Sequence, residues 1–400
     1  RRSSDLDRPV HLNVCFEEPL LENSSSQFSR EISSHRVQAL ASLKKGSGLP
    51  LAPLEEVGKK AQEVFEKFFR QIRHPFVVVG MLQPAERKSV VQLLAQWKFP
   101  VYFEATSGLR ENPILEPFRV SSADKIMERA QAAGYPIDGV IRIGGIPTFR
   151  FWRDLELKYP RLEVVSISRL PFSGLARSST FICGELPDLT EKILASEFIF
   201  KAHEFIAADR KIQRRFNEIL ASEPRSEPAL IATLSKRISN GSQVYVGNSL
   251  PIREWDLAAD FGNKNLEVWA SRGLNGIDGQ VSTFLGFARS DCENWAVIGD
   301  LTALYDLPGP WALSQRPDIR VNLLVVNNGG GKIFSRMFPY VEFQNNHQIR
   351  FKPWADLWGI KYEEWKDIPE NLCGGAPHRL IELLPDEEAT QRFWKKISCE

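Results

Sequence analysis

Trp295-Ala296-Val297-Ile298-Gly299-Asp300-Leu301 is followed along the chain by Val321-Asn322-Leu323-Leu324-Val325-Val326-Asn327-Asn328-Gly329-Gly330-Gly331. Each stretch begins with an apolar run that predicts a buried strand and ends in polar residues and glycine. Parallel strands end at the same edge of a sheet. We therefore expect Asp300 and Asn328 to share one crevice with free backbone carbonyls, and α/β folds usually bind ligands in such a crevice.

The oxygens expected in this crevice suit one kind of metal site. One carboxylate with neutral oxygens is too weak a set to cage a cation alone, but it suits Mg²⁺ that also binds a diphosphate. The alternative is that Gly, Asp and Asn are ordinary turn residues after two strands. The two halves occur together and in order, each after a buried strand, and this favours the metal site.

Composition limits the class of protein. The chain has 400 residues, 43% of them hydrophobic and 25% charged, as in ordinary globular proteins. A net charge of +1 gives no reason to expect a nucleic acid or an anionic membrane surface as partner. No apolar run approaches the ~20 residues of a membrane-spanning helix. The five cysteines form no Cys-x-x-Cys pair, so we expect a reducing compartment and neither a disulfide scaffold nor a zinc site.

Helix and strand patterns alternate over residues 54–190, which predicts an α/β domain with a doubly wound parallel sheet. Another α/β unit of the same kind is expected over 226–400. The elements expected in the first are helices at 54–72, 84–97, 122–133 and 149–159 and strands at 75–82, 101–104, 139–143 and 163–168. Strands expected in the second lie near 244–246, 266–270, 295–298, 321–326 and 380–383.

The remaining segments are expected to join or precede these domains. Residues 1–20, with an isolated strand at Pro9–Phe16, are typical of the end of a preceding domain. Residues 21–53 are rich in Ser, Gly and Pro and predict a linker. One long charged helix, Leu189–Leu220, is expected to supply the bridge over 191–225. Its basic cluster at 210–215 is interpreted as a solvated face.

Three further stretches narrow the family: Val246–Arg253, Ser271–Gly279 and Lys332–Ser335. Together with the opening motif, the sequence over about residues 225–345 resembles the MenD-type 2-succinyl-5-enolpyruvyl-6-hydroxy-3-cyclohexene-1-carboxylate synthases, which depend on thiamine diphosphate. Leu301 agrees with this type, whereas most thiamine-diphosphate enzymes have Gly there. The resemblance implies that most of an N-terminal pyrimidine-binding domain, with its activating glutamate, is absent, so that no catalytic residue is assigned here and the chain alone is expected to be inactive.

The resemblance also implies roles for single residues near the cofactor. Thiamine diphosphate and Mg²⁺ (or Mn²⁺) are the expected cofactors, with Asp300, the Asn328 side chain and the Gly330 carbonyl as metal ligands. Ile277 matches an apolar residue that supports the bent cofactor; its alternative role is core packing. The residues expected to contact the cofactor are Asn248, Gly276, Ile277, Gly279, Gly299, Leu301 and Thr302.

The substrates of the resembled family, 2-oxoglutarate and isochorismate, are dicarboxylates. Arginine binds a carboxylate through a bidentate fork that lysine lacks. Arg253 and Arg272 match the family's substrate arginines and Ser249 its hydroxyl contact; the alternative for each arginine is a surface ion pair. Arg150 of the middle domain is a further candidate. Ile333, Phe334 and Met337 match an apolar wall against the reacting carbons.

The implied reaction decarboxylates 2-oxoglutarate and adds the succinic semialdehyde carbanion to isochorismate, in menaquinone or phylloquinone biosynthesis. A cytoplasmic (or plastid stromal) location is expected. The expected assembly is a homo-oligomer or a complex with a pyrimidine-binding domain. Two alternatives stay open: another thiamine-diphosphate 2-oxoacid decarboxylase or synthase, and a catalytically incomplete structural chain.

Overall fold

The computed structural model describes residues 54–122, 124–170, 172–193, 202–262, 264–272, 276–335 and 340–398. These residues belong to one compact unit, Ala52–Glu400. The strand predicted at Pro9–Phe16, the linker predicted at 21–53 and the site residue Met337 lie outside the described residues.

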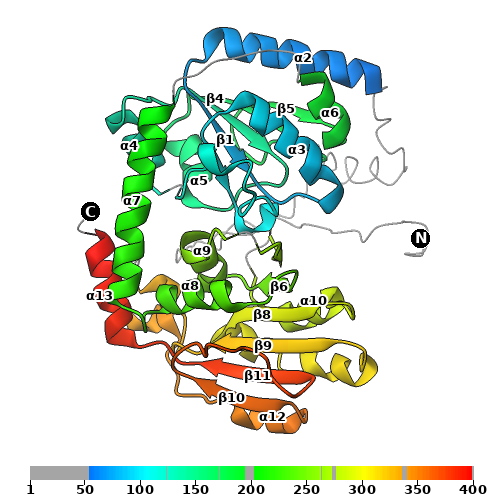
Figure 1. Ribbon diagram of the computed structural model, residues 1–400, viewed down its shortest axis with the longest axis vertical. Coiled ribbons are helices and arrows are strands. Elements are labelled where there is room, and N and C mark those ends of the chain that lie inside the picture. Colours follow the sequence, from blue (N-terminus) through cyan, green and yellow to red (C-terminus); the bar gives the residue numbers. More distant parts are fainter. Residues whose placement is uncertain are drawn as a thin grey trace, which may run out of the picture. The chain divides into compact units, whose positions relative to one another are not determined.

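Two all-parallel sheets organise the described residues (Figure 1). The first has the order β2-β1-β3-β4-β5 and the second the order β10-β11-β9-β8-β6-β7. In each sheet the order in which successive strands are added reverses once, between β1 and β3 in the first sheet and between β6 and β8 in the second. The α/β doubly wound fold class is therefore confirmed. The strands are β1 Pro75–Val79, β2 Val101–Phe103, β3 Gly139–Ile143, β4 Glu163–Ser168, β5 Thr180–Cys183, β6 Gln243–Val246, β7 Glu267–Trp269, β8 Glu293–Gly299, β9 Arg320–Val326, β10 Lys361–Trp365 and β11 His378–Leu383.

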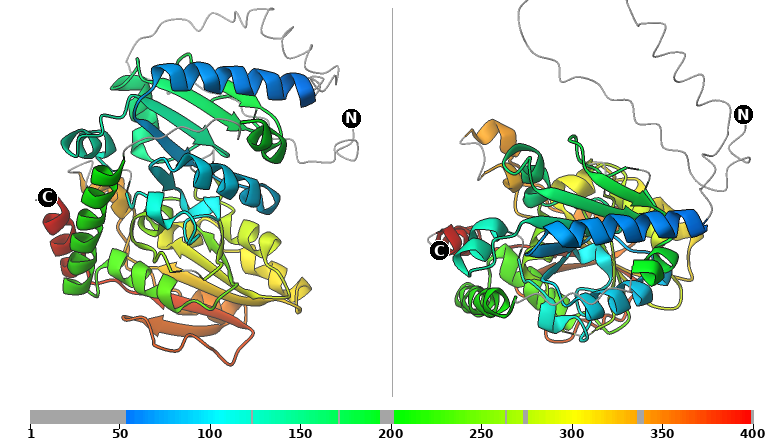
Figure 2. Two further views of the ribbon diagram at one scale, coloured as in Figure 1. Left: turned by 45° about the horizontal axis from the view of Figure 1, so that its top comes forward. Right: turned by 90° about the horizontal axis from the view of Figure 1, so that it is seen from above.

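Helices cover both faces of each sheet, which explains why the inner strands are mostly apolar. The α-helices are α2 Leu54–Gln71, α3 Pro84–Trp97, α4 Ile126–Ala132, α5 Arg150–Leu157, α6 Leu186–Ile193, α7 His203–Ser222, α8 Glu227–Arg237, α9 Leu250–Ala258, α10 Gln280–Phe287, α11 Asp300–Leu304, α12 Lys352–Leu357 and α13 Glu387–Ser398. Helix α13 runs alongside α7, where Phe393 meets Phe216 edge to face (Figures 1 and 2).

Local chemistry fixes the bounds of α3. Pro84 occupies its first turn, where a missing N–H costs nothing. The Glu86 carboxylate accepts a hydrogen bond from the Gln83 N–H at 2.7 Å and completes a capping box. Lys98 ends the helix in the left-handed conformation with φ of 56°. The predicted helix at 84–97 is therefore confirmed at both ends.

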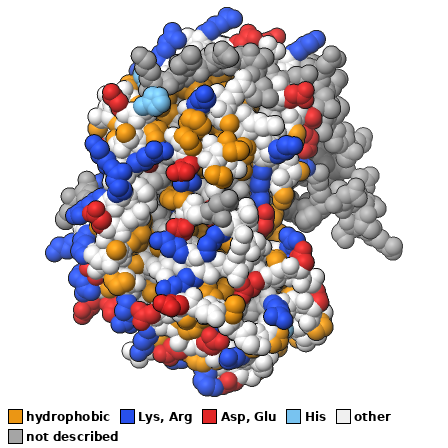
Figure 3. All heavy atoms as spheres, in the orientation of Figure 1, with side chains coloured by type: hydrophobic (Ala, Val, Ile, Leu, Met, Phe, Trp, Pro, Cys, Tyr) orange, Lys and Arg blue, Asp and Glu red, His pale blue; other side chains and the backbone are white. Residues whose placement is uncertain are grey.

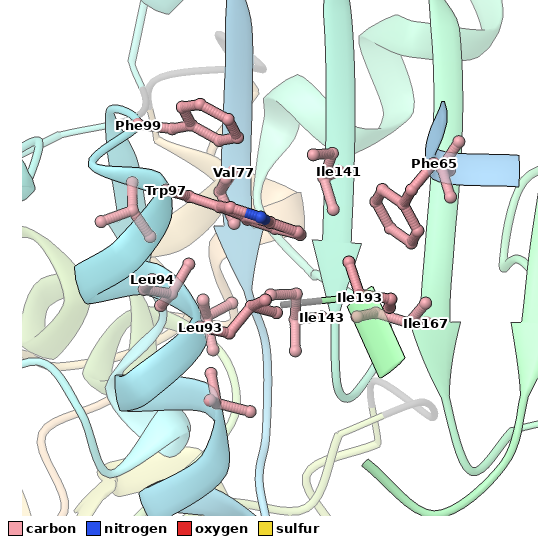
Figure 4. Packing of buried hydrophobic residues seen from close by; sticks show 14 of the residues in the cluster. Phe65, Val77, Leu93, Leu94, Trp97, Phe99, Ile141, Ile143, Ile167 and Ile193 are labelled. Atoms are coloured by element: carbon pink, nitrogen blue, oxygen red, sulfur yellow. The ribbon is translucent and has the colours of Figure 1, made fainter. Parts of the chain in front are cut away.

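The apolar face of α3 packs into the core of the first sheet. Figure 4 shows Trp97 and Leu93 of α3 against Val77 of β1, with Phe99 beside the indole. The Trp97 and Phe99 rings stack with centroids 5.3 Å apart. Large rigid side chains thus join the helix layer to the sheet.

The mutation Leu93→Ala is expected to lower the free energy of unfolding by about 2–5 kcal/mol, because it leaves a cavity at a fully buried position. Leu157→Ala is the matched control: the Leu157 side chain is 79% exposed, and the expected change is within about 0.5 kcal/mol. Urea denaturation of both variants measures the difference. Equal losses would show that the Leu93 contacts do not stabilise the domain.

The single helix predicted over Leu189–Leu220 is wrong. Among the described residues α6 ends at Ile193, α7 begins at His203, and Ala202 is not helical. Helix α6 belongs to the first domain, because its Leu189 and Ile193 pack into the core of the first sheet. A continuous charged and apolar pattern concealed this break.

The sequence did not predict two edge strands, and the helix predicted at 122–133 begins later than expected. Strand β5 has only four residues and buries just one of them fully, and β10 carries two glutamates and a lysine, so neither has a buried apolar run. Helix α4 begins only at Ile126, not at Ser122, because Lys125 adopts a left-handed conformation.

Basic and acidic side chains mingle over the face drawn in Figure 3. The predicted solvated face of α7 is confirmed, since Arg210, Lys211, Arg214 and Arg215 are all exposed. No helix within the described ranges is both long and apolar enough to cross a membrane.

Candidate functional site

Strands β8 and β9 end together, as the sequence predicted. They pair in parallel, with Gly299 opposite Val326. Asp300 and Asn327 therefore follow the two strands side by side at the carboxyl edge of the sheet. This edge is next to the point between β6 and β8 where the order of strand addition reverses.

The Asp300 carboxylate is the centre of this crevice. It is 2% exposed, and its Oδ2 accepts hydrogen bonds from the N–H groups of Gly329 and Gly330, both at 2.9 Å. Gly330 has φ of 141°, and a Cβ there would lie 2.5 Å from the Gln344 carbonyl oxygen. Only glycine lets the loop close on Asp300 in this way. Burial raises the pKa of Asp300, the main opposing effect being the hydrogen bond from Leu301 N–H.

The Asn328 carboxamide has a fixed orientation. Its Nδ2 donates to the Glu227 carboxylate, 2.9 Å from Oε2. Its Oδ1 is buried and accepts no hydrogen bond from any described residue. A buried amide oxygen without a donor is the kind of neutral ligand that Mg²⁺ takes beside a carboxylate, so the residues present fit the expected metal.

Glu227 is itself part of a buried carboxyl pair. Burial raises the pKa of Glu227 to about 7, and that of its neighbour Glu254 is well above its ordinary value. After burial, the charge of Glu227 is the next cause that raises the pKa of Glu254, so the two acids disfavour being ionised together. The Glu227 carboxylate accepts the hydrogen bond from Asn328 Nδ2.

The adjacent Asn327 has a structural role. Its Nδ2 donates to Glu382 of β11 at 2.7 Å and to the Ile349 carbonyl at 2.9 Å. The two asparagines thus divide the work: Asn327 ties β9 to the neighbouring strand, and Asn328 presents its oxygen.

His347 also contacts the crevice, and no motif in the sequence signalled it. Its Nε2 lies 3.3 Å from Asp300 Oδ2. Its Nδ1 accepts the Ile349 N–H at 3.2 Å, so a neutral His347 carries its proton on Nε2, on the side of Asp300.

A second group of predicted residues gathers at the ends of β6 and β7. The Arg272 Nη1 donates to Asn248 Oδ1 at 2.5 Å, and the Asn248 Nδ2 donates to the Gly276 carbonyl at 2.7 Å. Ser249 begins α9 with φ of 76°, a strained conformation for a residue with a Cβ. Arg253 donates to the Ser249 carbonyl at 2.6 Å, so the two lie on one side of the helix start, as predicted.

Arg253 and Arg272 lie close enough to affect one another. Desolvation and then the charge of Arg272 lower the pKa of Arg253. Desolvation also lowers the pKa of Arg272. Two cations held near one another form a site that favours a ligand with negative charge.

Comparison with known proteins gives the chain close relatives. A protein of Bdellovibrio bacteriovorus named 2-succinyl-5-enolpyruvyl-6-hydroxy-3-cyclohexene-1-carboxylate synthase is 41% identical over 400 residues, which cover 99% of this chain and 72% of that protein. A protein of the same name from Akkermansia muciniphila is 32% identical, covering 98% and 72%, and one from Lysinibacillus sphaericus is 28% identical, covering 98% and 70%. No family model matches the chain.

The chain belongs to this synthase family. The family depends on thiamine diphosphate, and the contacts predicted for single residues with this cofactor stay predictions. Gly276 and Ile277 lie in the loop before α10, and Gly279 begins that helix in the left-handed conformation. Gly299, Leu301 and the buried Thr302 surround Asp300 at the start of α11, which is only five residues long.

The other residues predicted to contact substrate differ in their exposure to solvent. Ile333 is half-buried and Phe334 exposed, in a short turn of helix after the loop Asn327–Gly331. Arg150 is two residues beyond Thr148, a contact of Arg272, but its own side chain is 74% exposed and pairs with Asp154 at 2.9 Å. The substrate roles of these residues stay predictions.

The sequence did not reveal the buried acids Glu104, Glu227 and Glu254 or the partly buried Asp256 around this site. Each is surrounded by other elements that are distant in sequence. A glutamate following a short apolar strand, as Glu104 follows β2, was the one available signal, because polar residues at the carboxyl end of a parallel strand often serve a site.

Glu104 makes stability depend on pH. Burial raises its pKa from 4.5 to about 8. Between these values the folded protein keeps a proton that the unfolded chain releases, so the free energy of unfolding falls as pH rises, with a slope approaching about 1.4 kcal/mol per pH unit. Glu104→Gln is expected to flatten this dependence between pH 5 and 8 in urea titrations; Asp256, whose pKa burial also raises, retains part of it. The exposed control Glu342→Gln should follow the wild type, and a Glu104→Gln curve parallel to wild type would contradict the assignment.

Proposed function

We propose that the protein decarboxylates 2-oxoglutarate and joins the resulting four-carbon unit to isochorismate, with thiamine diphosphate and Mg²⁺ (or Mn²⁺) bound at the carboxyl ends of β8 and β9. The observation that supports this most strongly is the buried Asn328 Oδ1 without a donor beside the buried Asp300 carboxylate. The product of this reaction would be an intermediate in the biosynthesis of menaquinone or phylloquinone.

The chain's residues divide into three groups in this proposal. Asp300, Asn328 Oδ1 and the Gly330 carbonyl would hold the metal, and the diphosphate would meet Leu301 and Thr302 and their neighbours. Thiamine diphosphate supplies the electron sink for decarboxylation when bound. The protein's part is to fix the cofactor, exclude water and orient the carboxylates.

Arg253, Arg272 and Ser249 form the group for the substrates. Two partly desolvated arginines suit ligands with two carboxylates, because each guanidinium offers a planar fork. Pyruvate-type substrates have no second carboxylate to occupy such a pair. This argues against a general 2-oxoacid decarboxylase.

The test is the consumption of substrate by the protein mixed with a separately produced pyrimidine-binding domain of this family and supplied with thiamine diphosphate and Mg²⁺. We expect 2-oxoglutarate and isochorismate to be consumed one for one, with release of one CO₂, and pyruvate to be consumed far more slowly. Equal use of pyruvate would favour the alternative decarboxylase. Tight cofactor binding without consumption of any 2-oxoacid would favour a structural role. Sedimentation of the same sample measures the predicted oligomer.

A further inference from the structure

Arg272 has a support that comes from the first sheet, not from its own domain. The Arg272 Nε donates to Thr148 Oγ1 at 3.1 Å, and Thr148 lies in the loop between β3 and α5. The Thr148 hydroxyl and backbone N–H both donate to Glu104 Oε1, at 3.0 and 2.8 Å. Glu104 directly follows β2. The contacts therefore form a chain from Glu104 through Thr148 to Arg272.

The direction of these hydrogen bonds is determined by the groups themselves. A hydroxyl has one proton, and because Arg272 can only donate, the proton of Thr148 points to Glu104. The oxygen lone pairs of Thr148 then face the guanidinium. Glu104 thus fixes the rotor of Thr148 in the state that accepts from Arg272.

The second support of Arg272 is Asn248 Oδ1, and it is neutral as well. Among the described residues Arg272 forms no ion pair, although Glu104 and Asp256 lie near enough to affect its pKa. Burial keeps Glu104 largely protonated near neutral pH, since its pKa is raised to about 8. The guanidinium is held in place by neutral oxygens, and its charge stays available for an anion.

We propose that Glu104, acting through Thr148, is a positioning residue that sets the Arg272 guanidinium for a substrate carboxylate. The proposal rests on the function proposed above, which gives Arg272 that carboxylate. It also assigns the first sheet a part in substrate recognition, because both supporting residues follow its strands.

Two variants each remove one of the hydrogen bonds that connect Glu104 to Arg272. Thr148→Val removes the hydroxyl and keeps the shape, while Thr148→Ser retains the hydroxyl. Glu104→Met removes the acceptor, while Glu104→Gln retains an acceptor oxygen. We expect Thr148→Val and Glu104→Met to raise the KM for 2-oxoglutarate or the Kd for isochorismate about tenfold, the effect of losing one hydrogen bond to a charged group. Turnover number and the affinity for thiamine diphosphate with Mn²⁺ should change less than about threefold, and Thr148→Ser and Glu104→Gln should stay near wild type.

The reference variant is Arg272→Lys, which separates the two proposals. KM comes from steady-state kinetics, and the Kd for isochorismate from calorimetry of the cofactor-loaded protein, where isochorismate alone does not react. If Arg272→Lys weakens a dicarboxylate and Thr148→Val does not, the positioning role is overturned and the proposed function stands. If Arg272→Lys affects neither dicarboxylate, both proposals fail.

A purely structural role is excluded by a different comparison. Loss of cofactor affinity and thermal stability in step with the loss of substrate affinity, in both Thr148→Val and Glu104→Met, would overturn the proposal. The double variant Thr148→Val with Arg272→Lys should cost less than the sum of the single changes, because both act on one contact. Strict additivity would also contradict the positioning role.

Discussion

Asp300→Ala is expected to weaken the Mg²⁺-dependent binding of thiamine diphosphate by at least about 100-fold, equivalent to about 2.7 kcal/mol. Asp300 would be the one carboxylate among the three proposed ligands, so its removal leaves the cation with neutral oxygens only. The fold should survive, because the strands on either side keep their pairing from Glu293 to Gly299. Calorimetric titration of the cofactor with and without Mg²⁺ measures the effect.

Asp318→Ala is the matched control for that experiment. Asp318 lies on the surface, where it pairs with Arg316 at 3.1 Å, and its loss should leave cofactor affinity unchanged. Circular dichroism and thermal melting of both variants establish that the fold is retained. Wild-type cofactor affinity in Asp300→Ala would remove the metal assignment.

Arg272→Lys is expected to reduce kcat/KM for the dicarboxylate substrates roughly 5- to 150-fold. This corresponds to a loss of about 1–3 kcal/mol in transition-state stabilisation. An ammonium cannot keep both the Asn248 and the Thr148 contacts and also offer a fork to a carboxylate. Cofactor affinity should change little. Steady-state kinetics with each substrate varied in turn measures the loss.

The control for Arg272→Lys is the same change at an exposed position. Arg289 pairs with Asp291 at the surface, and Arg289→Lys should leave the kinetics unchanged. An equal loss of substrate and cofactor binding in Arg272→Lys would mean that Arg272 holds the diphosphate or the fold instead.

The inner strands were predictable from sequence because their environment is uniform. Pro75–Val79 and Val321–Val326 are buried on both faces, and an apolar run, interrupted only by Asn322 in the second, identifies each. Edge strands such as Lys361–Trp365 face water and carry charge, which removes that signal. The break before His203 was missed because periodicity alone does not register one non-helical residue.

The site divides in the same way. The convergence of Gly299-Asp300 with Asn327-Asn328 follows from two parallel strands ending at one edge, which local sequence can predict. Its supports do not follow, because Glu227 and Glu382 reach the two asparagines from elements that only the fold brings near. Long-range polar contacts of this kind leave no pattern in a single sequence.

The most direct test of the central claim is a crystal structure of the protein with thiamine diphosphate and Mn²⁺, with the metal located by its anomalous scattering. The account predicts one strong peak about 2.0–2.3 Å from an Asp300 carboxylate oxygen, from Asn328 Oδ1 and from the Gly330 carbonyl oxygen, with the diphosphate completing the coordination. A metal and diphosphate bound elsewhere, or an Asn328 Oδ1 turned away from the ion, would contradict it.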